Sequence, residues 1–128
     1  MKKFIALFFT AITLFMFSSC GAHKELTYEQ ISPEQAKALL ESEENYIIID
    51  ARTEEEYDAG HIPGAILIPE YEIATRAESE LPDKNQLILV YCRSGRRSKI
   101  ASEELVKLGY TNVKEFGGII DWKYEIVK

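Results

Sequence analysis

Apolar runs alternate with segments of helical character along this chain. The runs that predict strands are residues 26–30, 46–49, 65–68, 87–91 and 111–116. The segments that predict helices, from apolar spacing or a helix-start motif, are residues 33–42, 53–59, 70–80 and 99–108. Because strands alternate with helices, the sequence predicts an α/β domain with a mainly parallel central sheet flanked by helices.

Two helix starts carry capping motifs. Ser32-Pro33-Glu34-Gln35 has an N-cap serine, a proline at the first helical position and a glutamine at the third. Thr53-Glu54-Glu55-Glu56 has the same arrangement without the proline. Gly60 and Gly109 follow the second and the last predicted helix, where glycine commonly ends a helix.

The run 87–91 is the most informative stretch, because five apolar or aromatic residues in a row are typical of a strand buried on both faces. Cys92 follows, then a polar loop with three arginines, then a helix. This order places the thiol at the carboxyl end of a strand and the amino end of a helix, where free N–H groups and the helix dipole favour an anion. We therefore expect a reactive, partly exposed thiol of lowered pKa.

A buried, inert cysteine is the structural alternative. It is less favoured because Cys92 stands at the end of the apolar run, beside Arg93, and not inside the run. A phosphatase is a second alternative, but its Cys-x5-Arg loop requires an arginine where this chain has Ser98. Arg97 gives Cys-x4-Arg instead, a shorter loop that is less suited to a tetrahedral phosphate.

The six-residue loop 92–97 resembles the active-site loop of the rhodanese (thiosulfate sulfurtransferase) family, which begins with the catalytic cysteine. Two more motifs are similar to that family's: Asp50-Ala51-Arg52 with Gly60-His61-Ile62-Pro63-Gly64-Ala65, and Gly117-Gly118-Ile119 with Trp122. The resemblance covers residues 27–124 and implies a rhodanese-like three-layer domain. It also implies that Cys92 accepts a sulfane sulfur as a persulfide and passes it to a nucleophile.

The candidate site residues follow from these motifs. Cys92 is the catalytic candidate. The substrate-binding candidates are Arg93, Ser94, Gly95, Arg96 and Arg97. Of these, Arg97 is the first candidate to orient the substrate anion, because it closes the loop at the helix start, and Arg93 is the second. We expect Asp50 and Arg52 to support the loop from behind.

Other residues are given structural roles. We expect His61 to be a satisfied structural histidine and Trp122 to contribute to packing. Two histidines and no Cys/His cluster favour no metal site, and the rhodanese resemblance implies no cofactor. A non-enzymatic persulfide carrier or sensor, a membrane-tethered binding module, and, less favoured, a phosphatase or arsenate reductase remain as alternative functions.

The first residues predict export. Lys2 and Lys3 precede an apolar run at 4–17, and Ser18-Ser19-Cys20 follows, which is typical of a secretory signal peptide. Residues 17–20 resemble the bacterial lipobox, so we expect residues 1–19 to be removed and Cys20 to be the lipid attachment site. Ordinary signal cleavage nearby is the alternative. Residues 20–26 then form a tether for a domain at 27–128, anchored to a bacterial membrane in the cell envelope.

Length and charge narrow the partners. A chain of 128 residues predicts one domain, and a net charge of −6 argues against a nucleic-acid partner. The three arginines near Cys92 are therefore expected to attract a small anionic sulfur donor, with a thiol or cyanide as acceptor. If Cys20 carries lipid, Cys92 is the only free thiol of an exported chain, which suggests a redox protein partner.

Overall fold

A computed structural model describes residues 27–128 of the protein. The expected signal peptide, the lipidated Cys20 and the tether lie outside these described residues. The strands are β1 (Glu29–Gln30), β2 (Tyr46–Asp50), β3 (Ile66–Leu67), β4 (Leu87–Cys92) and β5 (Val113–Gly118). The helices are α1 (Pro33–Ser42), α2 (Glu54–Ala59), α3 (Ile73–Glu80) and α4 (Arg96–Lys107), with short 3₁₀ helices η1 (Glu70–Glu72) and η2 (Ile119–Asp121).

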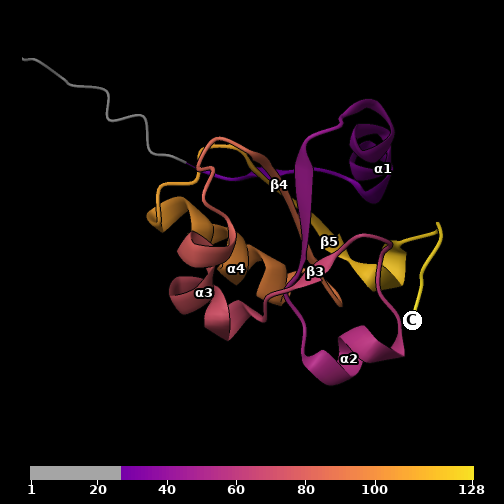
Figure 1. The fold of residues 1–128 in the computed structure, drawn as a ribbon. Helices are drawn as coiled ribbons and strands as arrows, with labels where there is room; N and C mark the ends of the chain where they lie inside the picture. The colour runs from indigo at the N-terminus through magenta and orange to yellow at the C-terminus, as the bar shows by residue number, and fades with distance from the viewer. Residues whose placement is uncertain (1–26) are drawn as a thin grey trace, which may run out of the picture.

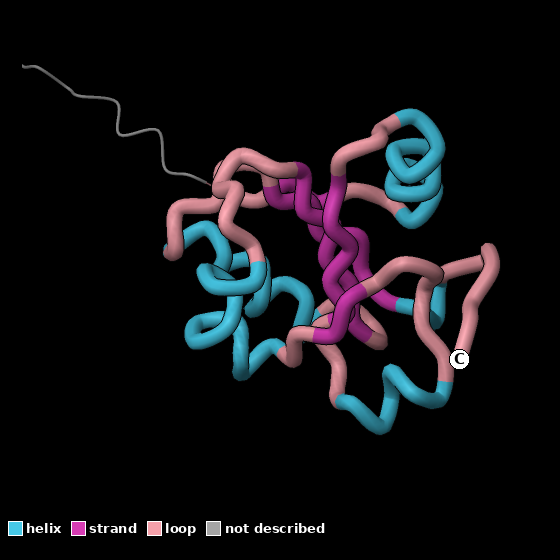
Figure 2. Tube along the Cα trace, in the orientation of Figure 1, coloured by secondary structure: helices cyan, strands magenta, loops and turns pink. Residues whose placement is uncertain are grey.

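The five strands form one parallel sheet in the order β1-β5-β4-β2-β3. Figure 2 shows the strands running through the middle of the domain with helices on both sides. The predicted α/β class with a parallel central sheet is confirmed. In β4 every residue is buried, as the apolar run indicated.

Two hydrophobic clusters separate the three layers. Figure 1 shows α3 and α4 together on one side of the sheet and α1 on the other. The α3–α4 side packs Ile73 and Leu105 against Ile88 and Val90 of β4. The opposite side packs Ala36 of α1 with the alternate β4 residues, which include Leu89 and Tyr91. Successive side chains of β4 therefore point to opposite faces of the sheet and contribute to both hydrophobic clusters.

Local signals placed the helix ends well. Ser32 and Thr53 both form the predicted capping boxes, and Gly60 caps the end of α2. Gly109 follows α4 with φ +96°, a left-handed conformation that glycine adopts without a steric penalty. The helix predicted at 70–80 is confirmed, with its first turn in the tighter 3₁₀ form.

The last strand differs from the prediction. It begins at Val113 and continues to Gly118, so Gly117 and Gly118 end the strand and η2 follows them. The pairing shifts between Val90 and Cys92, because Val90 pairs with Glu115 and Cys92 pairs with Gly118. One extra residue therefore lies on β5, and Gly117 absorbs the bulge with φ +83°.

This topology brings the ends of β2 and β4 together. Asp50, the last residue of β2, pairs with Tyr91, and Cys92 ends the neighbouring strand. Ligands of parallel α/β sheets bind at this carboxyl edge. Within residues 27–128, no helix is long and apolar enough to cross a membrane.

Candidate active site

Cys92 is more enclosed than the sequence indicated. The residue is only 1% exposed, so the expectation of a partly exposed thiol was wrong. The reason is that β5 extends to the level of the cysteine and pairs Gly118, its last residue, with it. The loop is also held to η2, since Ile120 of η2 donates its backbone N–H to the carbonyl of Arg93 at 3.3 Å.

Short-range dipoles surround the sulfur. The N–H of Gly95 donates to Cys92 Sγ at 3.0 Å, and Ser98 Oγ lies 3.4 Å from the same atom. Gly95 precedes α4 with φ +109°, a left-handed conformation that turns its amide towards the sulfur. The strand-loop-helix order therefore does place the thiol at a helix amino end.

These dipoles determine the protonation of the thiol. Burial raises the pKa of Cys92, but hydrogen bonds from the Ser98 hydroxyl and from the amides of Ser98, Gly95 and Ser94 outweigh it and leave the pKa below its ordinary value. The predicted direction agrees, whereas the physical source is different. Neutral donors have the largest lowering effects, and the charge of Cys92 in turn raises the pKa of Arg97, so this arginine also interacts with the sulfur.

The three arginines have different surroundings. Arg97 donates from both terminal nitrogens to Glu56, at 2.6 and 2.9 Å. These hydrogen bonds lower the pKa of Glu56 to about 2, although burial opposes the shift. Arg93 and Arg96 are exposed, and within the described residues neither forms a salt bridge.

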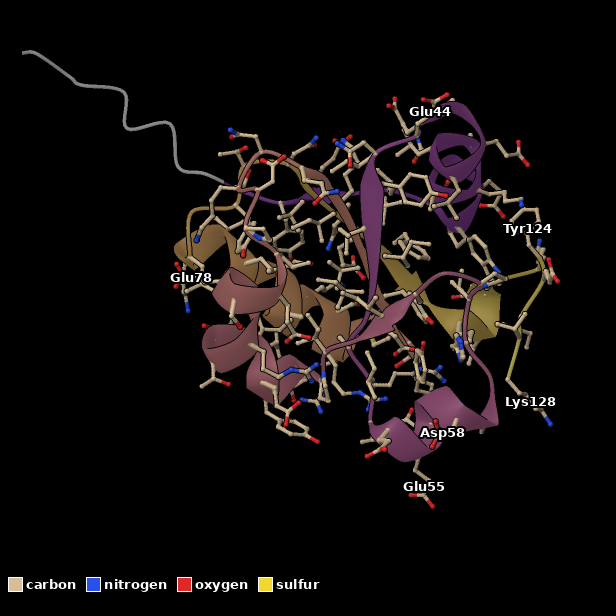
Figure 3. The ribbon with its side chains drawn as sticks, in the orientation of Figure 1. Glu44, Glu55, Asp58, Glu78, Tyr124 and Lys128 are labelled. Carbon is tan, nitrogen blue, oxygen red and sulfur yellow. The ribbon has the colours of Figure 1, made fainter. Side chains whose placement is uncertain are left out.

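The order of the anion-binding candidates changes accordingly. Arg97 was the first candidate to orient the substrate, yet its guanidinium is bound to Glu56 of α2. A role for Arg97 in substrate binding stays a prediction and requires this bond to be shared or exchanged. Arg93 and Arg96 carry the positive charge that is open to an incoming anion. Figure 3 shows that Glu55 and Asp58, also on α2, lie at the outer edge of the domain.

Asp50 and Arg52 form a buried pair behind the loop. Arg52 donates from Nη2 to Asp50 Oδ2 at 2.7 Å, and the same nitrogen donates to the carbonyl of Gly60 at 2.6 Å. The Tyr91 hydroxyl also donates to Asp50 Oδ2, at 2.7 Å. The pair therefore fixes Tyr91, the residue before Cys92. Support of the loop itself remains a prediction.

The sequence did not single out two buried side chains behind the sulfur, Ser98 and Glu115. Ser98 is fully buried, and its Oγ lies 2.6 Å from Glu115 Oε1. Glu115 is 2% exposed and also accepts from the N–H of Gly117 at 2.7 Å. One signal was present, because a glutamate between Val113 and Phe116 in a predicted strand must find a polar partner when it is buried.

The contacts of His61 fit a structural role. Its ring stacks on Tyr57 with 3.7 Å between the centroids, and Nδ1 lies 2.9 Å from the carbonyl oxygen of Tyr57. Trp122 packs on Phe116 at the edge of the second hydrophobic cluster. Neither residue contacts the cysteine loop by a hydrogen bond among the described residues.

Comparisons with known proteins agree with this geometry. A family model described as "Rhodanese-like domain" matches residues 32–125. Thiosulfate sulfurtransferase PspE of Escherichia coli is 45% identical over 73 residues, which cover 57% of this chain and 70% of PspE. The putative sulfur carrier protein YrkF of Bacillus subtilis is 40% identical over 94 residues, which cover 73% of this chain and 50% of YrkF. The structure of a rhodanese with anions from E. coli superposes with a TM-score of 0.61 and 42% identity, covering 65% of this chain and 98% of that one.

Proposed function

This chain belongs to the rhodanese-like domain family, whose members include sulfurtransferases, and from that premise we propose a sulfurtransferase that works through a Cys92 persulfide. The donor is a small anion that carries a sulfane sulfur, such as thiosulfate. The acceptor is a thiol or, in an assay, cyanide. No metal or organic cofactor takes part in this cycle.

In the first half of the cycle, the Cys92 thiolate attacks the outer sulfur of thiosulfate. A sulfur–sulfur bond forms to Cys92, the bond between the outer sulfur and the sulfonate sulfur breaks, and sulfite leaves with the electron pair. The exposed guanidiniums of Arg93 and Arg96 attract the donor and offset the charge on the departing sulfite.

In the second half, the terminal sulfur of the persulfide is transferred. A nucleophile attacks that sulfur, and Cys92 leaves as a thiolate, which restores the starting state. The loop amides favour the anionic sulfur in both states, because their dipoles are fixed before the reaction begins. Donor and acceptor react in turn with one cysteine, so steady-state kinetics should be ping-pong.

One observation carries this proposal. The sulfur of Cys92 lies at the carboxyl end of β4 within 3.0 Å of the Gly95 amide, in a loop whose hydrogen bonds lower the thiol pKa. A thiol of lowered pKa and a preformed site for an anionic sulfur are what a sulfur-accepting nucleophile needs.

The test uses the freshly reduced full-length chain. Thiosulfate is added, the intact mass is measured, and cyanide is then added and thiocyanate is determined. We expect a gain of one sulfur that is lost to cyanide, and no gain in the Cys92→Ser variant. No gain by a folded protein with a free thiol would refute thiosulfate as donor, and hydrolysis of a generic phosphate ester would favour the phosphatase alternative.

A carrier without turnover is the second candidate, because the relative YrkF is described as a putative sulfur carrier protein. Such a protein would take up the sulfur in the same assay but would not release it to cyanide or to small thiols. Sulfur retained on Cys92 under these conditions would favour the carrier.

We also propose that the chain is anchored in the bacterial cell envelope through lipid on Cys20. The basis is the apolar run at 4–17 followed by Ser18-Ser19-Cys20. Cys92 would then be the only free thiol of this chain, and the compartment is oxidising. This favours a redox protein as the partner that keeps Cys92 reduced. Membrane fractionation of the native chain and of Cys20→Ser tests the anchor, and release of the variant from the membrane is the expected result.

A further inference from the structure

Three buried side chains form a line behind the reactive sulfur. Cys92 Sγ lies 3.4 Å from Ser98 Oγ, and Ser98 Oγ lies 2.6 Å from Glu115 Oε1. The residues come from β4, α4 and β5, and each is at most 2% exposed. A carboxylate thus reaches the thiol through one hydroxyl group, in a place from which water is largely excluded.

The hydroxyl of Ser98 has one hydrogen and several acceptors around it. The carbonyl oxygens of Gly95 and Gly117 lie at 3.0 and 3.3 Å, but the carboxylate of Glu115 is closest, at 2.6 Å. A hydroxyl that donates to a carboxylate at this distance forms a strong, charge-assisted bond. While Glu115 is ionised, Ser98 therefore donates to Glu115 and turns a lone pair towards Cys92.

A lone pair facing the sulfur favours the thiol, because the S–H can donate to it and a thiolate would be repelled. A thiolate, and the lowering of the Cys92 pKa by the Ser98 hydroxyl, require the opposite arrangement, in which Ser98 donates to the sulfur. The hydroxyl cannot donate to both groups at once. The thiolate and the carboxylate therefore compete for one hydrogen, unless Glu115 itself becomes protonated.

We propose that Glu115 is a positioning residue for Cys92 that receives the thiol proton through Ser98. The S–H bond breaks and its proton goes to Ser98 Oγ, while the hydrogen of Ser98 passes to the carboxylate of Glu115. The two transfers together move a net of one proton from the sulfur to the carboxylate. The negative charge moves from oxygen to sulfur, and no oxidation takes place. The relay is argued from these contacts alone. Only its purpose, to prepare the nucleophile without a base from the solvent, rests on the proposed function.

The other charged groups near this line are already engaged. From α4, Arg97 is bound to Glu56 of α2, and from β2, Asp50 is bound to Arg52. The pKa of Tyr28, which precedes β1, is raised by burial most of all, then by the charge of Glu103 and then by the charge of Glu115. The N–H of Gly117 donates to Glu115 Oε1 and can do so in both protonation states. Among the described residues, Glu115 is the one carboxylate hydrogen-bonded to Ser98.

The relay predicts an unusual titration. Thiol with carboxylate and thiolate with carboxylic acid contain the same number of protons, so their ratio does not change with pH. The native protein should therefore keep a constant thiolate fraction over a range of pH below the main thiol transition. An isolated cysteine would instead lose thiolate about tenfold for each pH unit below its pKa.

The experiment follows the ultraviolet absorption of the thiolate in the reduced full-length chain across pH, with the Cys92→Ser chain as the blank. This blank contains Cys20 and every tyrosine, so the difference reports Cys92 alone. We expect the flat step in the native chain and its loss in Glu115→Gln and in Ser98→Ala. If Glu115→Gln does not fold, Ser98→Ala still decides the matter, since it removes only a hydroxyl group.

Ser102→Ala is the matched control. Ser102 lies one turn further along α4, is fully buried, and within residues 27–128 its hydroxyl has no hydrogen-bond partner. This variant should keep the native step. A native curve without a step, or a step that survives in Ser98→Ala, would overturn the relay, and the second result would indicate a charge effect through space. None of these readings needs sulfur transfer, so failure of the relay and failure of the proposed activity are separate outcomes.

Discussion

Replacing Gly118 by alanine should displace the cysteine loop. A Cβ at this position would lie 1.9 Å from the carbonyl oxygen of Arg93 and 2.5 Å from the backbone nitrogen of Ser94. Carbon and oxygen atoms that are not bonded approach to about 3.3 Å. The loop or the strand must therefore move by more than about 1 Å, and both partners are backbone, which cannot rotate away.

The displacement acts directly on the sulfur. The amide of Ser94 is one of the groups that lower the pKa of Cys92, and it belongs to the segment that would move. Forcing an extra carbon into a packed site costs about 1–3 kcal/mol of stability. A misplacement of about 1 Å at a reacting group can lower a rate by about 100-fold. We expect a loss of this order in the rate at which Cys92 gains sulfur from thiosulfate.

Gly109→Ala separates the two effects. Gly109 also has a positive φ, +96°, but no atom lies within 4 Å of its added Cβ, and it is outside the loop. This variant should lose about 1–2 kcal/mol through backbone strain and keep the native rate. Thermal unfolding and the rate of mass gain are measured for both variants. A folded Gly118→Ala chain that takes up sulfur at the native rate would refute the reasoning.

Three further changes test the surrounding contacts. Hydrogen bonds from Arg97 lower the pKa of Glu56 to about 2, so the pair stabilises the fold above the ordinary value of 4.5 and loses this effect as the pH falls towards 2. Glu56→Gln should thus cost about 1 kcal/mol in denaturant titrations at neutral pH, and the difference should disappear in acid. Asp50→Ala should cost about 3–5 kcal/mol, seen as a lowered Tm, because Arg52 is left buried without its carboxylate. Ser102→Ala should leave the Tm unchanged or slightly higher, because its buried hydroxyl has no partner among the described residues.

Features that depend on near neighbours in the chain were predicted well from the sequence. The β4 strand was evident from five consecutive apolar residues, and the capping boxes at Ser32 and Thr53 lie within four-residue motifs. The strand-loop-helix order also placed Cys92 correctly at the end of a strand. In each case the physical cause and its effect lie within about one turn of helix or one strand.

Features that depend on distant partners were missed. Arg97 and Glu56 are 41 residues apart, and Ser98 and Glu115 are 17 residues apart, so no local pattern shows that they meet. The pairing of Cys92 with Gly118, which helps to bury the thiol, depends on the extra residue that the bulge places in β5. The sequence showed which charges exist near the loop, but only the fold determines which of them are neutralised.

For the proposed transfer from an anionic donor, that pairing accounts for how an acidic protein can attract the donor. Arg97, the arginine at the start of α4, is neutralised by Glu56, whereas Arg93 and Arg96 are exposed to water, where an ion pair is weak and exchanges easily. At the sulfur itself, amides and a hydroxyl provide fixed dipoles, and the charge of Arg97 interacts with it. In the proposed cycle, a dianionic donor is attracted by exposed guanidiniums, whose ion pairs with the product anion exchange easily with water. These dipoles stabilise the Cys92 thiolate that begins the proposed cycle, and they stabilise it again in the second half, when the negative charge returns to this sulfur as it leaves.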